Sequence, residues 1–274
     1  MTEITVNLAS GHQIPFVVNT ECSGPAYFAL GIRKCGSSLF YKLVIQLARL
    51  NNRTFVDVAE RYFKSNIVSK DWIKDPANRA ILYGGNVYGG FREMPVTFAD
   101  APLYTEGKKI LMVRDPRDAL VSEYFSNAYS HGIPQPTQDA AGITILLEKL
   151  RREALHTQID EWVVDRAASL RAAFLGYVSQ LNSTSMTVVK YEEYIFKKPE
   201  LIRLIARNFD MRVDDAQVAH IMGWADVRPA QEVPTQFIRR VTPGDHREKL
   251  RPDTIARLNK ILKPAMDAFG YAPL

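Results

Sequence analysis

The residues from 31 to 38 have the types and spacing of a phosphate-binding loop. They read Gly31-Ile32-Arg33-Lys34-Cys35-Gly36-Ser37-Ser38. The two glycines and the final hydroxyl fit the pattern G-x-x-x-x-G-K-[ST], in which backbone N–H groups surround a phosphate. Ser37 replaces the lysine of that pattern, and a lysine stands inside the loop instead, as Lys34. The spacing therefore predicts an anion site whose lysine has a different task.

The displaced lysine indicates which chemistry the loop performs. An enzyme that uses ATP needs a lysine on the β- and γ-phosphates and a carboxylate at a strand end for its magnesium ion. The sequence offers no convincing carboxylate of that kind. Lys34 can instead lie against the bridging oxygen of a leaving group, where negative charge develops as the bond breaks. We therefore expect transfer of an anionic group with no metal ion required.

A strand before the loop and a helix after it must hold these residues in place. Residues 26–32 form an apolar run, and apolar residues recur at helical spacing from 39 to 47. The same strand-to-helix pattern returns at 110–113 and 119–129, and a third strand is expected at 186–191. Further helices are expected at 143–181, as one long helix or two stacked ones, and at 199–209, 214–222 and 253–269.

Strands that alternate with helices indicate an α/β fold with a mostly parallel central sheet flanked by helices. The 274 residues, of which 46% are hydrophobic, suffice for one such domain over residues 1–274. The phosphate-loop-like strand, loop and helix then lie near the N-terminus of the domain. Residues 1–20 alternate loosely around Gly11 and predict a hairpin extension at the domain edge.

The composition indicates in which compartment the protein works and which kinds of partner it binds. A formal net charge of +5 suits an anionic ligand but is too small for a protein that coats nucleic acid. The two cysteines, Cys22 and Cys35, argue against a disulfide framework and for a reducing, cytoplasmic setting. No run approaches 18 apolar residues and no signal peptide is recognisable, so we expect neither membrane insertion nor export.

The segment Lys34-Cys35-Gly36-Ser37-Ser38 resembles the Lys-x-Gly-Thr/Ser-Thr/Ser loop of the sulfotransferases that use 3′-phosphoadenosine 5′-phosphosulfate (PAPS). The resemblance implies that Lys34 assists departure of the bridging oxygen. It also implies that the loop, from Arg33 to Ser38, holds the 5′-phosphate and the sulfate. Leu39 replaces a tryptophan that is usual in cytosolic members, and Arg33 precedes the lysine as in many carbohydrate-modifying members, so the class of acceptor stays open.

Three later segments match the same family in order. Arg114 and Ser122 fit its 3′-phosphate segment, R-[DN]-P-x-D-x-x-x-S, which places a guanidinium at a strand end and a hydroxyl about two helical turns on. Arg239 and Arg240 fit the basic pair of its R-K-G-x-x-G-D-W loop, although Val241 replaces a glycine and His246 a tryptophan. Tyr191 fits its Tyr-Glu-Asp/Glu motif, which implies a position near the adenine.

Attack by a hydroxyl on sulfur requires a base. Cytosolic relatives place a histidine about twenty residues before the 3′-phosphate arginine, and the corresponding segment here contains Glu93. We therefore expect Glu93 to be the base, with Arg92 beside it to orient the sulfate or an acidic acceptor. The alternatives are the five histidines of the chain, which are His12, His131, His156, His220 and His246.

The complete prediction is a PAPS-dependent sulfotransferase with adenosine 3′,5′-bisphosphate (PAP) as its product. Its acceptor would be a hydroxyl of a small metabolite or a carbohydrate. Aromatic residues between 83 and 104 suit either acceptor, and the lack of lysine or arginine runs favours the small metabolite slightly. One alternative is an ATP-dependent phosphotransferase with a degenerate phosphate loop. The other is a non-catalytic nucleotide-binding protein of the same fold, in which Lys34 would not matter for function.

Overall fold

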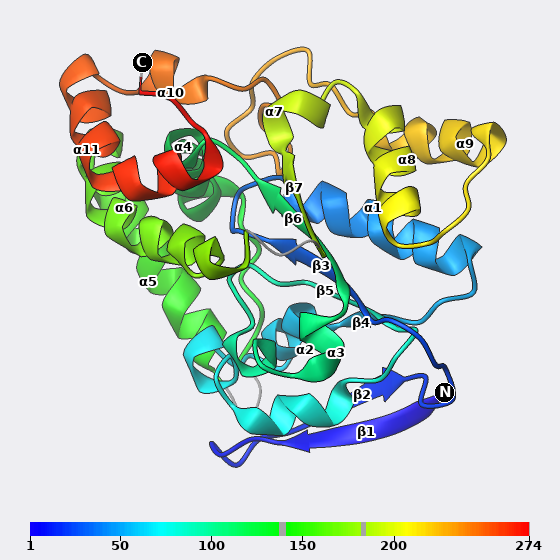
Figure 1. Cartoon of the computed structure of the whole chain (residues 1–274). Helices are drawn as coiled ribbons and strands as arrows, with labels where there is room; N and C mark the ends of the chain where they lie inside the picture. Colours follow the sequence, from blue (N-terminus) through cyan, green and yellow to red (C-terminus); the bar gives the residue numbers. More distant parts are fainter. Residues whose placement is uncertain (137–140, 182–184, 274) are drawn as a thin grey trace.

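A five-stranded sheet lies at the centre of the computed structural model, which describes residues 1–136, 141–181 and 185–273 (Figure 1). The strands follow the order β4-β5-β3-β6-β7, and all neighbouring pairs are parallel. Their bounds are Tyr27–Gly31 for β3, Phe55–Asp57 for β4, Val87–Gly89 for β5, Lys108–Val113 for β6 and Met186–Lys190 for β7. The fold class predicted from the sequence, a single α/β domain with a mostly parallel sheet, is confirmed.

The register brings the chemically interesting segments to one edge of the sheet. Gly31 of β3 lies opposite Met112 of β6, and Val113 of β6 lies opposite Lys190 of β7. The segments that follow these three strands therefore leave the sheet side by side at its carboxyl edge. In open parallel sheets, this edge is where ligands bind.

Helices cover both faces of the sheet (Figure 1). Their bounds are Ser37–Leu50 (α1), Val58–Lys64 (α2), Pro102–Thr105 (α3), Pro116–Phe125 (α4), Gly142–His156 (α5), Ile159–Leu175 (α6), Tyr191–Tyr194 (α7), Lys198–Asn208 (α8), Asp215–Ala225 (α9), Asp245–Lys249 (α10) and Pro252–Phe269 (α11). A π-helical turn, Ser126–Ser130, continues α4. Short 3₁₀ turns lie at Ser69–Asp71, Pro76–Ile81, Val96–Phe98 and Val178–Gln180.

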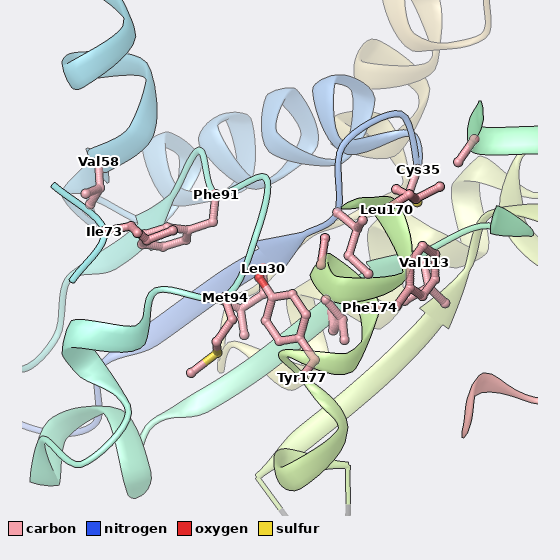
Figure 2. Packing of buried hydrophobic residues seen from close by; sticks show 14 of the residues in the cluster. Leu30, Cys35, Val58, Ile73, Phe91, Met94, Val113, Leu170, Phe174 and Tyr177 are labelled. Carbon is pink, nitrogen blue, oxygen red and sulfur yellow. The ribbon is translucent and has the colours of Figure 1, made fainter. Parts of the chain in front are cut away.

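The alternation of side chains along β3 explains the two layers. Tyr27 and Ala29 belong to a buried cluster with α1, α8 and α9, whereas Phe28 and Leu30 belong to the cluster formed with α4, α6 and α11. Successive side chains of a strand point to opposite faces, so a run that is buried on both faces reads as continuously apolar. Figure 2 shows Leu30 in the second cluster, with Phe174 and Tyr177.

The observed elements differ from the sequence-based expectations in length and number. The segment 143–181, expected as one long helix or two stacked ones, contains two helices, α5 and α6. No helix of the described chain is long and apolar enough to cross a membrane. The strands β4 and β5 were not predicted, because three residues each are too few to show a period. Thr2–Asn7 (β1) and Gln13–Val18 (β2) form an antiparallel hairpin that packs on β4 and the 3₁₀ turn Pro76–Ile81.

Candidate functional site

The loop between β3 and α1 turns sharply enough to aim its backbone at one point. Gly36, the N-cap of α1, has a φ of 81°, and Lys34 has a φ of 64°. This left-handed conformation costs a residue with a side chain roughly 1–2 kcal/mol, and such strain is concentrated at functional sites. Ser37 and Ser38 open α1, whose first N–H groups have no partner within the helix. Amides and hydroxyls therefore face a common anion position.

Tyr191, the first residue of α7, connects the loop with two other segments. Its ring covers Gly36 so closely that a Cβ on Gly36 would lie 2.6 Å from Cδ2 of the tyrosine. Its hydroxyl donates a hydrogen bond of 2.8 Å to the carbonyl of Val241, and the Arg114 guanidinium lies 4.6 Å from the ring centroid. Tyr191 thus lies where all three phosphate-binding segments expected from the sequence meet.

Several arginine side chains lie near Lys34. Burial lowers the pKa of the Lys34 ammonium to about 8; the charge of Glu123 opposes this shift, and the charges of Arg92, Arg114 and Arg239 add to it. We call Lys34, Arg92, Arg114 and Arg239 the cationic cluster. Like charges held close together raise the energy of the free protein, and a bound anion relieves that repulsion. The cluster therefore fits a ligand that carries several negative charges.

Arg114 follows β6 directly and is buried at the strand end. Its Nη2 lies 3.4 Å from Oδ2 of Asp118, and its Nε has no hydrogen-bond partner within the described residues. The guanidinium therefore keeps donors for a ligand. Ser122 is half-buried on α4, four residues after Asp118 and so on the same face of the helix.

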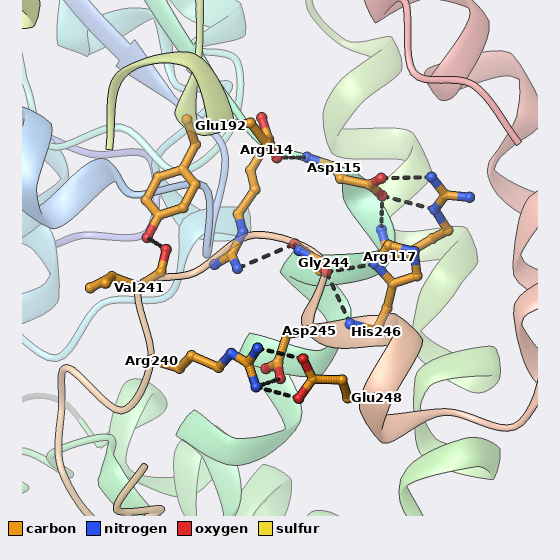
Figure 3. Close-up of polar contacts among 12 residues, drawn as sticks. Arg114, Asp115, Arg117, Glu192, Arg240, Val241, Gly244, Asp245, His246 and Glu248 are labelled. Atoms are coloured by element: carbon orange, nitrogen blue, oxygen red, sulfur yellow. Dashed lines mark hydrogen bonds and ion pairs between the residues drawn. The ribbon is translucent and has the colours of Figure 1, made fainter. Parts of the chain in front are cut away.

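Asp118 attaches the C-terminal loop to this strand end, and Figure 3 shows Gly244 and His246 of that loop close to Arg114. It accepts hydrogen bonds from the amides of Gly244, at 2.7 Å, and His246, at 3.0 Å, and its Oδ1 lies 2.6 Å from Nδ1 of His246. Burial opposes ionisation, but the hydrogen bonds from His246 and Gly244 and the charge of Arg114 hold the pKa of Asp118 well below its usual range. The sequence motif contained Asp118 but did not reveal this role.

The two neighbouring arginines of the C-terminal loop share Asp245 as a partner but differ in burial and in their second carboxylate. Arg239 is buried, pairs with Glu232 and Asp245, and lies 4.1 Å from the ring centroid of Phe125. Arg240 is more exposed, and one of its nitrogens lies 2.6 Å from a carboxylate oxygen of Glu248. Arg239 therefore belongs to the cationic cluster, whereas Arg240 lies on its outer side.

The remaining loop residues take supporting positions. The Arg33 side chain turns to Glu123 and Ser169, at 3.1 Å each, while its amide donates to the carbonyl of Arg92 at 3.0 Å. Cys35 is buried, and that burial raises the pKa of its thiol to about 12. Arg33 therefore faces α4 and α6, and its backbone joins the loop to the segment after β5.

That segment separates the two residues expected beside the acceptor. The Arg92 guanidinium lies over the ring of Tyr41, 4.8 Å from its centroid, and its charge acts on Lys34. Glu93 lies on the side of Tyr177, where its charge, after burial, contributes to the raised pKa of that phenol. The Tyr177 hydroxyl in turn donates to the carbonyl of Gly31 at 3.3 Å. Arg92 is therefore placed by its contact with Tyr41, and Glu93 by its influence on Tyr177.

Two titratable residues lie near the cationic cluster. The sequence did not point to the first, Asp57, and it offered the second, His131, only as an alternative base. Asp57 ends β4, and its pKa is raised to about 6, chiefly by burial and next by the charge of Glu60. His131 follows the π-helical turn; burial lowers its pKa, and the charges of Lys34, Arg151 and Arg92 act in the same direction. No group of three or more metal-ligating side chains occurs within residues 1–136, 141–181 and 185–273.

Comparisons with known proteins agree with this geometry. A family model for the sulfotransferase domain matches residues 94–270. The structure of mouse sulfotransferase SULT7A1 complexed with PAP is 12% identical and covers 89% of this chain and 85% of its own, with a TM-score of 0.57. Retinol dehydratase in complex with androsterone and the inactive cofactor PAP is 12% identical and covers 96% and 90%, with a TM-score of 0.51. No curated protein matches the sequence significantly.

Proposed function

The chain belongs to the sulfotransferase domain family, and we propose that it transfers the sulfuryl group of PAPS to an acceptor hydroxyl of a small metabolite or a sugar. The observation that carries the proposal is the cationic cluster at the carboxyl edge of the sheet. PAPS has anionic groups at the 3′ and the 5′ positions of its ribose, and the cluster offers cations from four separate segments. Androsterone in the solved retinol dehydratase complex favours a small-molecule acceptor.

Each part of the cluster has a separate task in this proposal. The loop around Lys34 holds the 5′-phosphosulfate, and Arg114, Ser122 and Arg239 hold the 3′-phosphate. Tyr191 lies between these two positions, where it can border the adenine. Arg114 and Lys34 are close enough for their charges to interact, so both ends of one nucleotide can be bound simultaneously.

The reaction is an in-line displacement at sulfur. The acceptor oxygen forms a new O–S bond while the bond from sulfur to the bridging phosphate oxygen breaks, and the acceptor proton passes to a base. Lys34, with a pKa of about 8, is mostly protonated at neutral pH and can neutralise the bridging oxygen as PAP leaves. Positioned cations and amides supply this stabilisation, and we expect activity to persist in EDTA.

Calorimetric titration with PAP, and with ADP for comparison, tests the donor site. We expect PAP to bind at least about tenfold more tightly, a difference of roughly 1.4 kcal/mol that the 3′-phosphate supplies. Arg114→Ala should remove this preference, whereas Lys34→Ala should retain detectable PAP binding and lose turnover. Equal or tighter binding of ADP would favour the ATP-dependent phosphotransferase, and tight PAP binding without turnover would favour the non-catalytic alternative.

The arginine pair supplies a matched control for the geometry. Arg239→Ala removes a member of the cationic cluster, and Arg240→Ala removes the same side chain one residue later, where it faces Glu248. We expect the first variant to weaken PAP binding about tenfold or more and the second to weaken it much less. Equal losses would show that the loop rearranges on binding.

Both cysteines are free, which supports a reducing, cytoplasmic setting.

A further inference from the structure

A second carboxylate, apart from Glu93, lies at the edge of the sheet where the cationic cluster is assembled. Asp57 is the last residue of β4 and lies opposite Gly89 of β5. The segment that follows β5 carries Arg92, which belongs to the cluster. Parallel pairing therefore brings Asp57 to the carboxyl edge beside that segment. Because β4 has only three residues, the sequence alone does not reveal this position.

The Asp57 carboxylate is enclosed without being neutralised. Its Oδ1 is buried and has no hydrogen-bond partner in the described part of the chain. The structure makes room for this oxygen at Gly90, whose φ is 86° and whose Cβ, if present, would lie 2.2 Å from Oδ1. The backbone N–H of Glu60 donates to this carboxylate and lowers its pKa, but burial outweighs that hydrogen bond. A carboxylate that is only partly compensated for its burial readily accepts a proton.

Charged neighbours connect Asp57 with the reacting end of the site. The charge of Arg92 acts on Asp57 and also on Lys34. Its guanidinium donates a hydrogen bond of 3.3 Å to the carbonyl of Gly90, the residue that packs against the Asp57 carboxylate. Glu60 and Lys64 of α2 face Asp57 from the other side, and Tyr41 of α1 is close enough to be influenced by its charge. Arg92 is thus a charged neighbour that Asp57 and Lys34 share.

We infer that Asp57 is the general base that removes the proton from the acceptor hydroxyl. This inference rests on the proposed sulfuryl transfer and assigns a residue to one of its steps. As the acceptor oxygen bonds to sulfur, its proton passes to the carboxylate of Asp57, and the electron pair of the broken S–O bond leaves with PAP. Arg92 holds the transferred group between the base and Lys34. Glu93, beside Tyr177, is the competing carboxylate.

Asp57 also precedes α2 as its N-cap, so the test must separate chemistry from folding. Asp57→Asn keeps the size and the capping ability of the residue, because asparagine is as good an N-cap as aspartate. We expect this variant to bind PAP within about twofold of the parent, and to lose roughly 100-fold or more in the release of PAP from PAPS. The probe is PAPS itself, with water and a panel of phenols, sterols and sugars as acceptors.

The dependence of kcat/KM on pH gives a readout that a purely structural residue would not change. The rate should rise through a pKa near 6, as Asp57 loses its proton, and fall through a pKa near 8, as Lys34 does. Glu60→Gln is the matched variant, because removal of this neighbouring negative charge should lower the pKa of Asp57 and move the acidic limb to lower pH. Loss of the acidic limb in Glu93→Gln, with Glu60→Gln unchanged, would assign the base to Glu93.

A measurement without turnover keeps the two proposals distinguishable. Carboxyl carbon NMR of the full chain, labelled at aspartate, should show one residue titrating near pH 6 that is absent in Asp57→Asn. An ordinary carboxyl titration for Asp57, or full activity of Asp57→Asn, overturns the inference while PAP binding still supports the sulfotransferase. Failure of the parent protein to bind PAP overturns the proposed function and with it this assignment.

Discussion

Replacement of Gly36 by alanine tests whether the phosphate loop and the Tyr191 ring form one rigid unit. Gly36 has a φ of 81°, and its added Cβ would lie 2.6 Å from one ring carbon of Tyr191 and 3.1 Å from another. The ring cannot move away freely, because its hydroxyl is bonded to Val241 and the Arg114 guanidinium lies against its face. The variant therefore combines backbone strain with overpacking.

The two costs can be separated by a second glycine. Left-handed backbone costs alanine roughly 1–2 kcal/mol, and forcing a methyl group into a packed site costs about 1–3 kcal/mol. Gly11 has a φ of 87°, and its Cβ would meet nothing within 4 Å in the described structure. Gly11→Ala should therefore show only the first cost, and Gly36→Ala should be about 1–3 kcal/mol less stable than Gly11→Ala.

Urea unfolding of both variants measures this difference, and calorimetry measures the effect on PAP. We expect Gly36→Ala to weaken PAP binding more than tenfold, since the loop or the ring must shift, and Gly11→Ala to leave it unchanged. Combining Gly36→Ala with Tyr191→Ala should recover about 1 kcal/mol of stability relative to the sum of the single variants. Equal stability of the two alanine variants, with no coupling to Tyr191, would refute the argument.

Three further variants probe the surroundings of the site. Asp118→Asn should cost about 1–3 kcal/mol of stability and weaken PAP binding in calorimetry. Because the pKa of Asp118 is depressed in the folded state, its contribution to stability is present above about pH 4 and lost on further acidification. The free energy of unfolding of the variant should therefore decrease less than that of the parent when the pH is lowered below about 4. Glu232→Gln removes a partly exposed competitor for Arg239 and should tighten PAP binding by about threefold in the same titration. Arg117→Leu leaves the buried Asp115 carboxylate without its bidentate partner and should cost about 3–5 kcal/mol in urea unfolding.

The sequence predicted the long elements of the fold and missed the short ones. The strands β3, β6 and β7 have five or six residues each, and the apolar runs in β3 and β6 are long enough to be recognised in the sequence. The strands β4 and β5 have three residues each and owe their conformation to pairing, of β5 with β3 and of β4 with β5. Tertiary pairing, which leaves no local signal, therefore decides the sheet order at that side.

The candidate site shows the same division between local and tertiary information. Lys34 and Arg114 stand in compact motifs whose spacing alone indicates an anion ligand. The separation of Arg239 from Arg240 depends on how the C-terminal loop folds around Glu232, Asp245 and Glu248, which residue types and spacing do not reveal. Asp57 reaches the site only through β4, so residue types and spacing could not distinguish it from an ordinary helix cap.

The burial of Cys35 has a practical consequence for biophysical work on this protein. With a pKa of about 12, this thiol is almost entirely protonated at neutral pH and shielded from reagents, although it lies within the phosphate loop. Cys22 is exposed and free. The unaltered chain therefore carries one addressable thiol, and a maleimide fluorophore attached there would report on the molecule without engineering of the loop.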